Sequence, residues 1–417
     1  MRTAAYAFSP ADEHLKLGVE GYSPALLAKI VRQGGKAPSF SEASADLQAL
    51  AEFEISPKHV ERLTERVGRE WAATRDKEVE LFKQDRLFRH YGQTPGTVAV
   101  MLDGGRLQTR ADAGRSGVHQ AAWCEPKYAC CLSLQSQISL LDPQPKPPSK
   151  LLDPERVRRL VQELREVHAP RAQRTATVCS ARRKRKRRRP RRTQVLVRTA
   201  VATLAGVEDF GYQVATEVFR RNFDTAEYKA CVCDGQHYNW AVWKTHLQPL
   251  GFVPILDFLH MLSYLYAAAH ASVKAPLPAW QKYERWLRAT WAGDVDTVLQ
   301  ELERDVQRLG PPPDTVADNE PRAIVFDARR YLQNNRERMN YPRYRRLGLP
   351  ISSAPVESLI KQFNRRVKGS EKFWLHGGAE AVLQVRAAYL SQDDRADRFW
   401  NSPRPRLRAA GAHRLAS

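Results

Sequence analysis

The chain has 417 residues, of which 42% are hydrophobic and 9% aromatic, a composition typical of a globular protein and unlike that of a disordered one. This length allows two or three domains and a sizeable core. The net charge of +21 at pH 7 predicts a polyanionic partner. Taking away the ten positive charges of Arg182–Arg192 still leaves +11, so the rest of the protein is also expected to attract phosphates.

Cysteine usage and hydropathy indicate that the protein is located in a reducing cytoplasm. None of the six cysteines belongs to a Cys-x-x-Cys pair, so we expect buried free thiols rather than a zinc site. The amino terminus does not resemble a signal peptide, and no apolar run is long enough to cross a membrane. The cysteines are Cys124, Cys130, Cys131, Cys179, Cys231 and Cys233.

Residues 1–95 are expected to form a helical amino-terminal region. Two segments, beginning at Ser41 and Ser56, open with capping residues and carry apolar residues at helical spacing. The second is interpreted as a short helix. This helix is expected either to dock on DNA or to pack against the rest of the protein.

The periodicity changes from residue 96. Thr97 begins an apolar run that ends in Asp103-Gly-Gly, as expected of a buried strand with an acid at its carboxyl end. The segment 106–110 is expected to pair back as a hairpin. Residues 123–134 are interpreted as one long second strand.

Residues 141–193 are interpreted as an insertion with a charged helix over 154–167 and a basic tract. Because blocks of like charge repel and rarely fold alone, the tract is expected to be an arm that binds the DNA backbone without sequence preference. A solvated loop without a dedicated role is the alternative. The basic residues assigned to DNA binding here are Arg182, Arg183, Lys184, Arg185, Lys186, Arg187, Arg188 and Arg189.

Deletion of Arg182–Arg192 tests this interpretation. The deletion is expected to weaken binding to all DNA sequences alike and to flatten the salt dependence of binding, because fewer phosphates are neutralised. The measurement is a binding titration at several salt concentrations on two unrelated duplexes. A loss of sequence preference alone would show instead that the tract contacts bases.

The sheet is expected to resume with a third strand over 195–204 and a helix over 207–222. A strand from Tyr228 then ends in Asp234-Gly, the same form as the Asp103 segment, and a Trp-rich helix from Tyr238 leads to a strand over 252–257. Three strands, then alternating helices and strands, is the order of the ribonuclease H fold, since parallel neighbours require crossovers. The predicted class is therefore α/β, a ribonuclease H-like, mixed five-stranded sheet.

The catalytic core is predicted to be discontinuous. Its first part would span 96–260, and an all-helical insertion over 261–345 would precede the completion of the core over 346–400, which carries Glu357. A basic tail follows over 401–417. Three tryptophans are expected to fill the core of the insertion: Trp280, Trp286 and Trp291.

The segment 352–374 predicts a helix with two different faces. Ser352 or Ser353 suits the cap, Pro355 the first turn and Gly369 the end. One stripe is apolar: Val356, Leu359, Ile360, Phe363 and Val367. The other side has Glu357 at the head of a basic and polar row, and an ordinary basic surface helix is the alternative. The residues expected to hold DNA are Lys361, Arg365, Arg366, Lys368 and Lys372.

Asp103, Asp234 and Glu357 together suit hard divalent cations, because carboxylates at strand ends and a helix start offer oxygen ligands. We predict Mg²⁺ or Mn²⁺, two ions, with Asp103 bridging both and the other two acids binding one each. His260, one turn after Asp257, is a candidate for positioning the scissile phosphate or assisting proton transfer. A structural histidine is the alternative.

Five blocks in chain order carry a family resemblance: Val-Met-Leu-Asp103-Gly-Gly-Arg, Trp123-Cys-Glu-Pro-Lys, Cys-Asp234-Gly-Gln-His-Tyr-Asn-Trp, Ile-Leu-Asp257-Phe-Leu-His260 and the Glu357 segment to Phe-Trp. Together they resemble bacterial insertion-sequence transposases of the DDE class, ISKra type, over residues 10–400. The resemblance implies a ribonuclease H-like core with Asp103, Asp234 and Glu357 as its acids. It also implies nicking at element ends, strand transfer by the freed 3′-hydroxyl, and a nucleoid-associated cytoplasmic protein that oligomerises on DNA.

The chain departs from this family in two places. Many relatives begin with a cysteine-rich, zinc-ribbon-like segment that has no counterpart here, so terminal-repeat recognition is expected to be weaker or to depend on residues 1–95. Relatives tend to have His where this chain has Pro355. A catalytically inactive or domesticated DNA-binding derivative is therefore the alternative, and a nuclease that cuts without strand transfer is a third interpretation.

Overall fold

The computed structural model describes residues 21–89, 93–110, 122–168, 193–313, 320–369 and 372–402, and the side chains of these residues except 165–168. Its fold is α/β, as predicted, with a mixed five-stranded sheet in the order β5-β4-β1-β6-β7. β4 runs antiparallel to β1 and β5, whereas β1, β6 and β7 are parallel. The strands are β1 (Thr97–Gly104), β4 (Lys127–Ser136), β5 (Thr193–Thr203), β6 (Tyr228–Cys233) and β7 (Val253–Leu256).

The segments between β1 and β4 differ from the prediction. β2 (Leu107–Thr109) pairs with β3 (Ala122–Cys124) in a separate two-stranded sheet, and not with β1. The expected long second strand is divided at Pro126, which has no N–H to give to a ladder. The Pro126 carbonyl instead accepts the N–H of Gly105 at 3.0 Å, so the division lies beside the end of β1.

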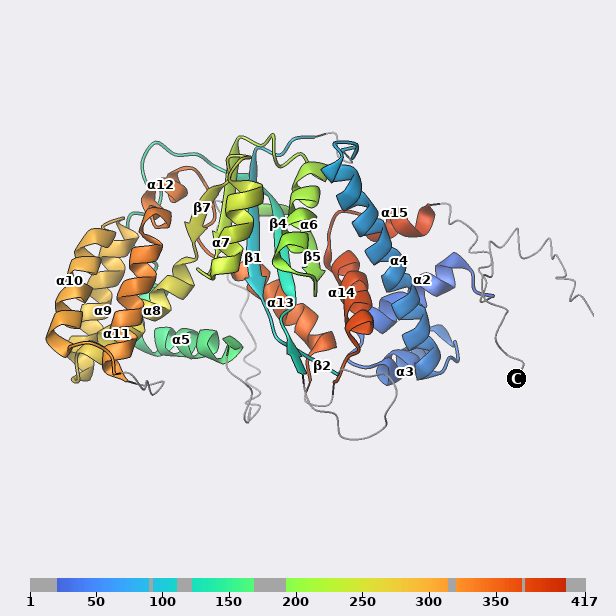
Figure 1. Ribbon diagram of the computed structural model, residues 1–417, viewed down its shortest axis with the longest axis horizontal. Helices are drawn as coiled ribbons and strands as arrows, with labels where there is room; N and C mark the ends of the chain where they lie inside the picture. Colours follow the sequence, from blue (N-terminus) through green and yellow to red (C-terminus); the bar gives the residue numbers. More distant parts are fainter. Residues whose placement is uncertain are drawn as a thin grey trace, which may run out of the picture.

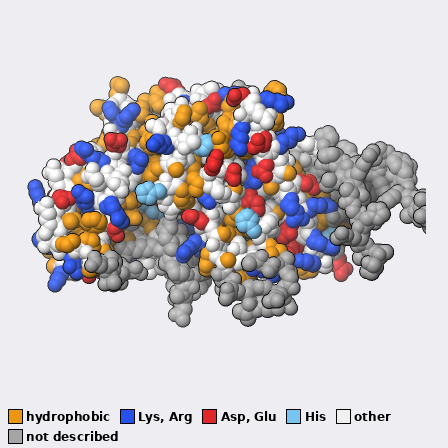
Figure 2. All heavy atoms as spheres, in the orientation of Figure 1, with side chains coloured by type: hydrophobic (Ala, Val, Ile, Leu, Met, Phe, Trp, Pro, Cys, Tyr) orange, Lys and Arg blue, Asp and Glu red, His pale blue; other side chains and the backbone are white. Residues whose placement is uncertain are grey.

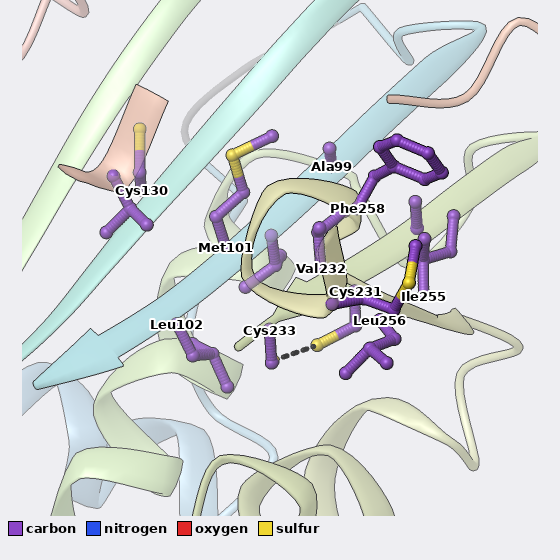
Figure 3. Packing of buried hydrophobic residues seen from close by; sticks show 14 of the residues in the cluster. Ala99, Met101, Leu102, Cys130, Cys231, Val232, Cys233, Ile255, Leu256 and Phe258 are labelled. Atoms are coloured by element: carbon purple, nitrogen blue, oxygen red, sulfur yellow. Dashed lines mark hydrogen bonds between the residues drawn. The ribbon is translucent and has the colours of Figure 1, made fainter. Parts of the chain in front are cut away.

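The middle of the sheet is apolar on both sides, as expected for parallel strands covered by helices. Figure 3 shows Met101 of β1 and Val232 of β6, which are in register, on the same side of the sheet as Phe258, and Leu256 of β7 on the other side. The thiols of Cys231 and Cys233 lie 3.6 Å apart within this core. Four of the five described cysteines are buried, in agreement with the prediction of buried thiols, Cys124 is half-buried, and Cys179 lies outside the described residues.

Helices cover both faces of the sheet (Figure 1). α6 (Val207–Arg220) covers one face, where Arg221 at its end donates to Ser133 Oγ of β4 at 2.9 Å. α7 (His237–Val242), which continues as the π-helical turn η2 (Trp243–Leu247), connects β6 to β7. On the opposite face, the ring of Phe363 lies 5.0 Å from that of Tyr128. Because Tyr128 pairs with Asp103 in register, Asp103 points to this second face.

The described regular elements between residues 258 and 346 are helical and lie at the left of Figure 1. Trp286 and Trp291 are buried in this group, whereas Trp280 is only half-buried at its edge. Tyr283 Oη donates to Leu151 O at 3.2 Å, which joins the group to the segment before α5. The elements of this group are α8 (Phe258–Ser272), α9 (Pro276–Trp291), α10 (Val295–Leu309), α11 (Pro321–Asn334), η3 (Arg336–Arg338) and α12 (Tyr341–Arg346). The segment that Tyr283 contacts contains η1 (Ser149–Leu151) and is followed by α5 (Pro154–His168).

Three amino-terminal helices pack at the other end of the molecule (Figure 1): α2 (Pro24–Lys36), α3 (Phe40–Ala51) and α4 (Pro57–Lys83). The helix from Pro57 was expected to be short, but it has 27 residues. Its length follows from packing along α14 (His376–Leu390): a Cβ on Gly68 would lie 2.2 Å from Ala381 O, so the two backbones approach closely. α13 (Ala354–Val367) and α15 (Arg395–Asn401) complete the fold.

A buried ionic cluster ties the end of α14 to the sheet. Asp393 accepts from Thr199 Oγ1 of β5 at 2.8 Å and from Arg395 at 2.6 Å, and Arg395 also bonds Glu217 of α6 at 2.8 Å. Burial by itself would raise the pKa of Asp393, but the charge and hydrogen bonds of Arg395 and the bond from Thr199 hold it well below its usual range.

The variant Asp393→Asn is expected to lose about 2–4 kcal/mol of unfolding free energy at pH 7, because Arg395 keeps a buried charge with one partner fewer. An acid with a depressed pKa stabilises the fold above the pKa it has when unfolded, and this stabilisation disappears as the pH falls through the folded-state pKa. The gap between wild type and variant should therefore shrink below about pH 4. Denaturant unfolding at several pH values measures it, and a constant gap would contradict the assignment.

The surface carries charges of both signs. Figure 2 shows Lys and Arg side chains spread over the visible face and interspersed with Asp and Glu. Among the described residues, no helix combines the length and the apolar character needed to span a membrane.

Candidate active site

Two of the predicted acids meet at one edge of the sheet. Asp103 lies at the carboxyl end of β1 and Asp234 directly follows β6, and these two strands are parallel neighbours. The Gly104 N–H donates to Asp103 Oδ1 at 2.7 Å. Asp234 Oδ1 accepts from the Gln236 N–H and from Asn239 Nδ2, both at 3.1 Å. Both acids are buried, at 5% and 8% exposure.

The third acid, Glu357, lies in the first turn of α13. Ser353 Oγ donates to Glu357 Oε1 at 3.2 Å, and His260 Nδ1 lies 3.9 Å from the same oxygen. Because α13 covers the face to which Asp103 points, the structure brings Glu357 to the same edge as Asp103 and Asp234. The predicted ends of this helix are close to those observed: Ser353 precedes it, and it ends at Val367, shortly before Gly369.

The electrostatics of the three acids reflect this proximity. Burial raises the pKa of Asp103 well above its usual range, and the charges of Asp234 and then Glu357 raise it further, against a lowering by His260. Burial is also the main reason why the pKa of Glu357 is raised. A buried carboxylate such as Asp103, whose pKa is raised by desolvation and by neighbouring negative charges, favours binding of a cation, since a cation relieves both the repulsion and the desolvation.

Asp257 and His260 form a hydrogen-bonded pair beside Glu357. Asp257 is fully buried and caps α8: its Oδ2 accepts from the His260 N–H at 2.9 Å and from His260 Nδ1 at 2.6 Å. Its Oδ1 accepts from the Ser353 N–H at 2.9 Å, so Asp257 also holds the residue that precedes α13. Burial would lower the pKa of His260, but the bond to Asp257 and the nearby acids raise it to about 10, so the imidazole is protonated at neutral pH.

One group of side chains among the described residues has the spacing of metal ligands, and it differs from the predicted set. Ligand atoms of Asp257, His260 and Glu357 lie within 4.8 Å of one another. However, both oxygens of Asp257 accept hydrogen bonds, and His260 Nδ1 is bonded to Asp257. Asp103 and Asp234 do not belong to this group, and the hydrogen bonds that Asp103, Asp234 and Glu357 accept from described residues involve one carboxylate oxygen of each.

The basic residues predicted to form one row lie on different faces of α13. Lys361 and Arg365 are exposed one and two turns after Glu357. Arg366 is a correction, because its side chain is buried and donates to Gly34 O at 2.8 Å and to Pro38 O at 3.3 Å. One residue corresponds to about 100° of helical rotation, which places Arg366 beside the apolar stripe rather than in the basic row.

The remaining predicted DNA contacts differ in how far the structure describes them. Lys368 and Lys372 are half-buried, and Lys372 Nζ donates to Arg366 O at 3.3 Å. The basic residues over 182–189 lie outside the described residues. Lys368, Lys372 and this tract therefore stay predictions.

Sequence reasoning missed two side chains near Asp103. Tyr238 of α7 and Glu125, between β3 and β4, both approach Gly104: a Cβ built there would lie 2.4 Å from Tyr238 Oη and 2.7 Å from Glu125 Oε1. Nearness in sequence to Asp234 was a signal for Tyr238, which lies at the second position of the helix that follows this acid. Glu125 had no such signal, because its position depends on how the chain turns at Pro126.

A third missed residue comes from the helical group. Tyr331 of α11 donates its hydroxyl to the Asp234 carbonyl oxygen at 2.5 Å. A Cβ on the next residue, Gly235, would lie 2.6 Å from the Tyr331 ring, and Gly235 has a φ of +101°, so glycine is required there for two reasons. Comparisons with models of known protein families and with curated proteins find no match for this chain.

Proposed function

We propose that this protein is a DNA transposase of the DDE class, which cleaves DNA at the ends of an insertion sequence and transfers the freed 3′ ends to a target. The observation that carries the proposal is the position of Asp103, Asp234 and Glu357 near one edge of the sheet, where burial and then the charges of Asp234 and Glu357 raise the pKa of Asp103. Acids that only ended turns would not need to be buried close together, because burial and like charges disfavour their ionised forms.

The topology supports a ribonuclease H-like core for the proposed enzyme. An antiparallel meander of β1, β4 and β5 followed by parallel β6 and β7 is the arrangement that this fold requires. Asp103 ends the central strand and Asp234 the neighbouring one, and α13 brings Glu357 from a segment beyond the helical group. Helices from residue 258 to 346 therefore separate the acids in sequence without separating them in space.

The donor set fits Mg²⁺ or Mn²⁺, since Asp103, Asp234 and Glu357 offer carboxylate oxygens, which these hard cations prefer. Two such ions, when bound, would supply the charge that activates a nucleophilic oxygen and stabilises the leaving one. Asp103 would be shared between them, and Asp234 and Glu357 would hold one each. Asp257 and protonated His260 would keep Glu357 and the start of α13 in place.

The exposed face of α13 would position the DNA. Lys361 and Arg365 follow Glu357 at successive turns, so cations line one path that leads away from the acids. Contacts of this kind bind phosphates and set the position of the strand without specifying its sequence. A dimer or larger assembly on DNA is part of the proposal, because two element ends must be brought together. Association with the nucleoid is also part of the proposal.

The test is a cleavage assay on supercoiled plasmid that carries the element's ends, with Mg²⁺, Mn²⁺ or EDTA. Metal-dependent nicking at the ends is the expected result, and joining of the cut ends to a target separates a transposase from a nuclease that only cuts. Binding without cutting in every metal condition would overturn the enzyme proposal and leave an inactive DNA-binding derivative.

A further inference from the structure

Tyr238 has a buried hydroxyl that the fold does not use. Its Oη is closed off from solvent and has no hydrogen-bond partner among the described residues. An unpaired buried hydroxyl carries a free-energy cost, and native structures keep very few of them. Where such a group borders a site that a ligand enters, the ligand can supply the missing partner.

The surroundings of this hydroxyl are those of the proposed active site. The charges of Asp103, Glu125 and Asp234 all act on Tyr238, and burial with these charges raises its pKa above the usual value for a phenol. Its oxygen rests against Gly104, directly after Asp103, in a space that a side chain larger than hydrogen would fill. Glu125 faces the same space and is exposed, so rotation of its side chain would open a route to the hydroxyl.

The chemistry of the site limits what the partner can be. The three neighbouring carboxylates are acceptors, yet none is bonded to Tyr238 in the described structure, so the phenol O–H keeps its proton to donate. An arriving group must therefore offer an acceptor oxygen within reach of Asp103 and Asp234. Phosphate oxygens of a DNA strand meet this description, since they accept hydrogen bonds and come to this edge in the proposed reaction.

We propose that Tyr238 is a further substrate-binding residue of the site, whose hydroxyl donates a hydrogen bond to a phosphate oxygen of the DNA strand held at Asp103 and Asp234. This inference rests on the proposed function. Gly104 is then required for two reasons: its N–H bonds Asp103, and its lack of a side chain leaves room for the hydroxyl.

The experiment compares Tyr238→Phe with wild type in two measurements. In denaturant unfolding without metal or DNA, the midpoint of Tyr238→Phe is expected to stay unchanged or rise, because the hydroxyl has no partner to lose. In single-turnover cleavage of the plasmid with Mg²⁺, the rate is expected to fall roughly 10- to 100-fold, the loss typical of one hydrogen bond to a charged group.

Tyr128→Phe is the matched control. Its hydroxyl is also buried without a partner among the described residues, and it pairs with Asp103 in the sheet, but the whole side chain is closed off beneath Phe363. It is expected to cleave at the wild-type rate.

Three results would overturn the inference while the proposed function stands: wild-type cleavage by Tyr238→Phe, a lowered unfolding midpoint of that variant, or an equal loss of cleavage in Tyr128→Phe. The first would show that DNA does not use the hydroxyl, and the second that the hydroxyl has a structural role. The third would show that the effect is not specific to Tyr238. Absence of cleavage by the wild-type protein would overturn both the inference and the proposed function.

Discussion

Glu357→Gln, Asp234→Asn and Asp103→Asn are each expected to lower metal-dependent DNA cleavage by roughly 10³-fold or more, because each removes the charge of one acid and keeps its shape. DNA binding should be nearly unchanged, since the expected phosphate contacts come from basic residues such as Lys361 and Arg365. Single-turnover cleavage and a binding titration without divalent metal measure the two effects separately.

The metal-free stability of these variants gives an independent readout. Burial and neighbouring charges raise the pKa of Asp103, so its ionised form is disfavoured in the fold, and Asp103→Asn is expected to unfold at the same or a higher denaturant concentration. Glu284→Gln is the control: Glu284 pairs with Arg288 on the surface of α9, and its loss should change neither cleavage nor binding. Near-wild-type cutting by any one of the three active-site variants would rule out the assignment of that acid.

Arg365→Ala and Arg366→Ala are expected to affect different properties, DNA binding and stability, although the two residues are neighbours in sequence. Arg366→Ala should lower the free energy of unfolding by about 2–4 kcal/mol, because it leaves a cavity and the unpaired carbonyls of Gly34 and Pro38. Arg365→Ala should leave stability unchanged and weaken binding to all DNA sequences alike, with a salt dependence reduced by about one phosphate contact. Denaturant unfolding and salt-dependent titrations measure both.

The packing of Arg366 explains why stability depends on it. Its guanidinium lies 4.2 Å from the ring centre of Phe40 and 5.1 Å from that of Trp374, so it joins α13 to the amino-terminal helices as well as bonding carbonyls. Burial, with a further contribution from the charge of Arg386, lowers the pKa of Arg366 to about 10. If Arg366→Ala unfolded like wild type while binding DNA more weakly, the residue would contact DNA as the sequence had suggested.

Local patterns carried much of the fold prediction. The alternation of buried strands and helices predicted the α/β class, and β6, β7, α6 and α13 begin and end within a few residues of the predicted limits. The two Asp-Gly strand ends predicted that Asp103 and Asp234 would lie at one edge, because parallel neighbours bring their carboxyl ends together. These features depend on hydrogen bonding and burial within short segments.

Other features depended on contacts between distant segments. The sequence around β2 is compatible with pairing to β1, and the choice of β3 depends on the turn at Pro126. The helix from Pro57 extends to Lys83 because α14 supplies a surface along which it packs, and α14 lies about three hundred residues away in the chain. The periodicity of residues 57–83 gives no information about α14, so the length of this helix could not be predicted from it.

By itself, the sequence determined the class of fold, the basic character of the protein and the acids that end two neighbouring strands, because these follow from periodicity and charge. Only the tertiary structure decided which side chains lie beside these acids. It turned Arg366 into the core and left Arg365 outside, and it placed Tyr238, Glu125 and Tyr331 around the acids. The physical reason is that burial, hydrogen bonding and pKa depend on what surrounds a side chain, and those surroundings come from segments far apart in the chain.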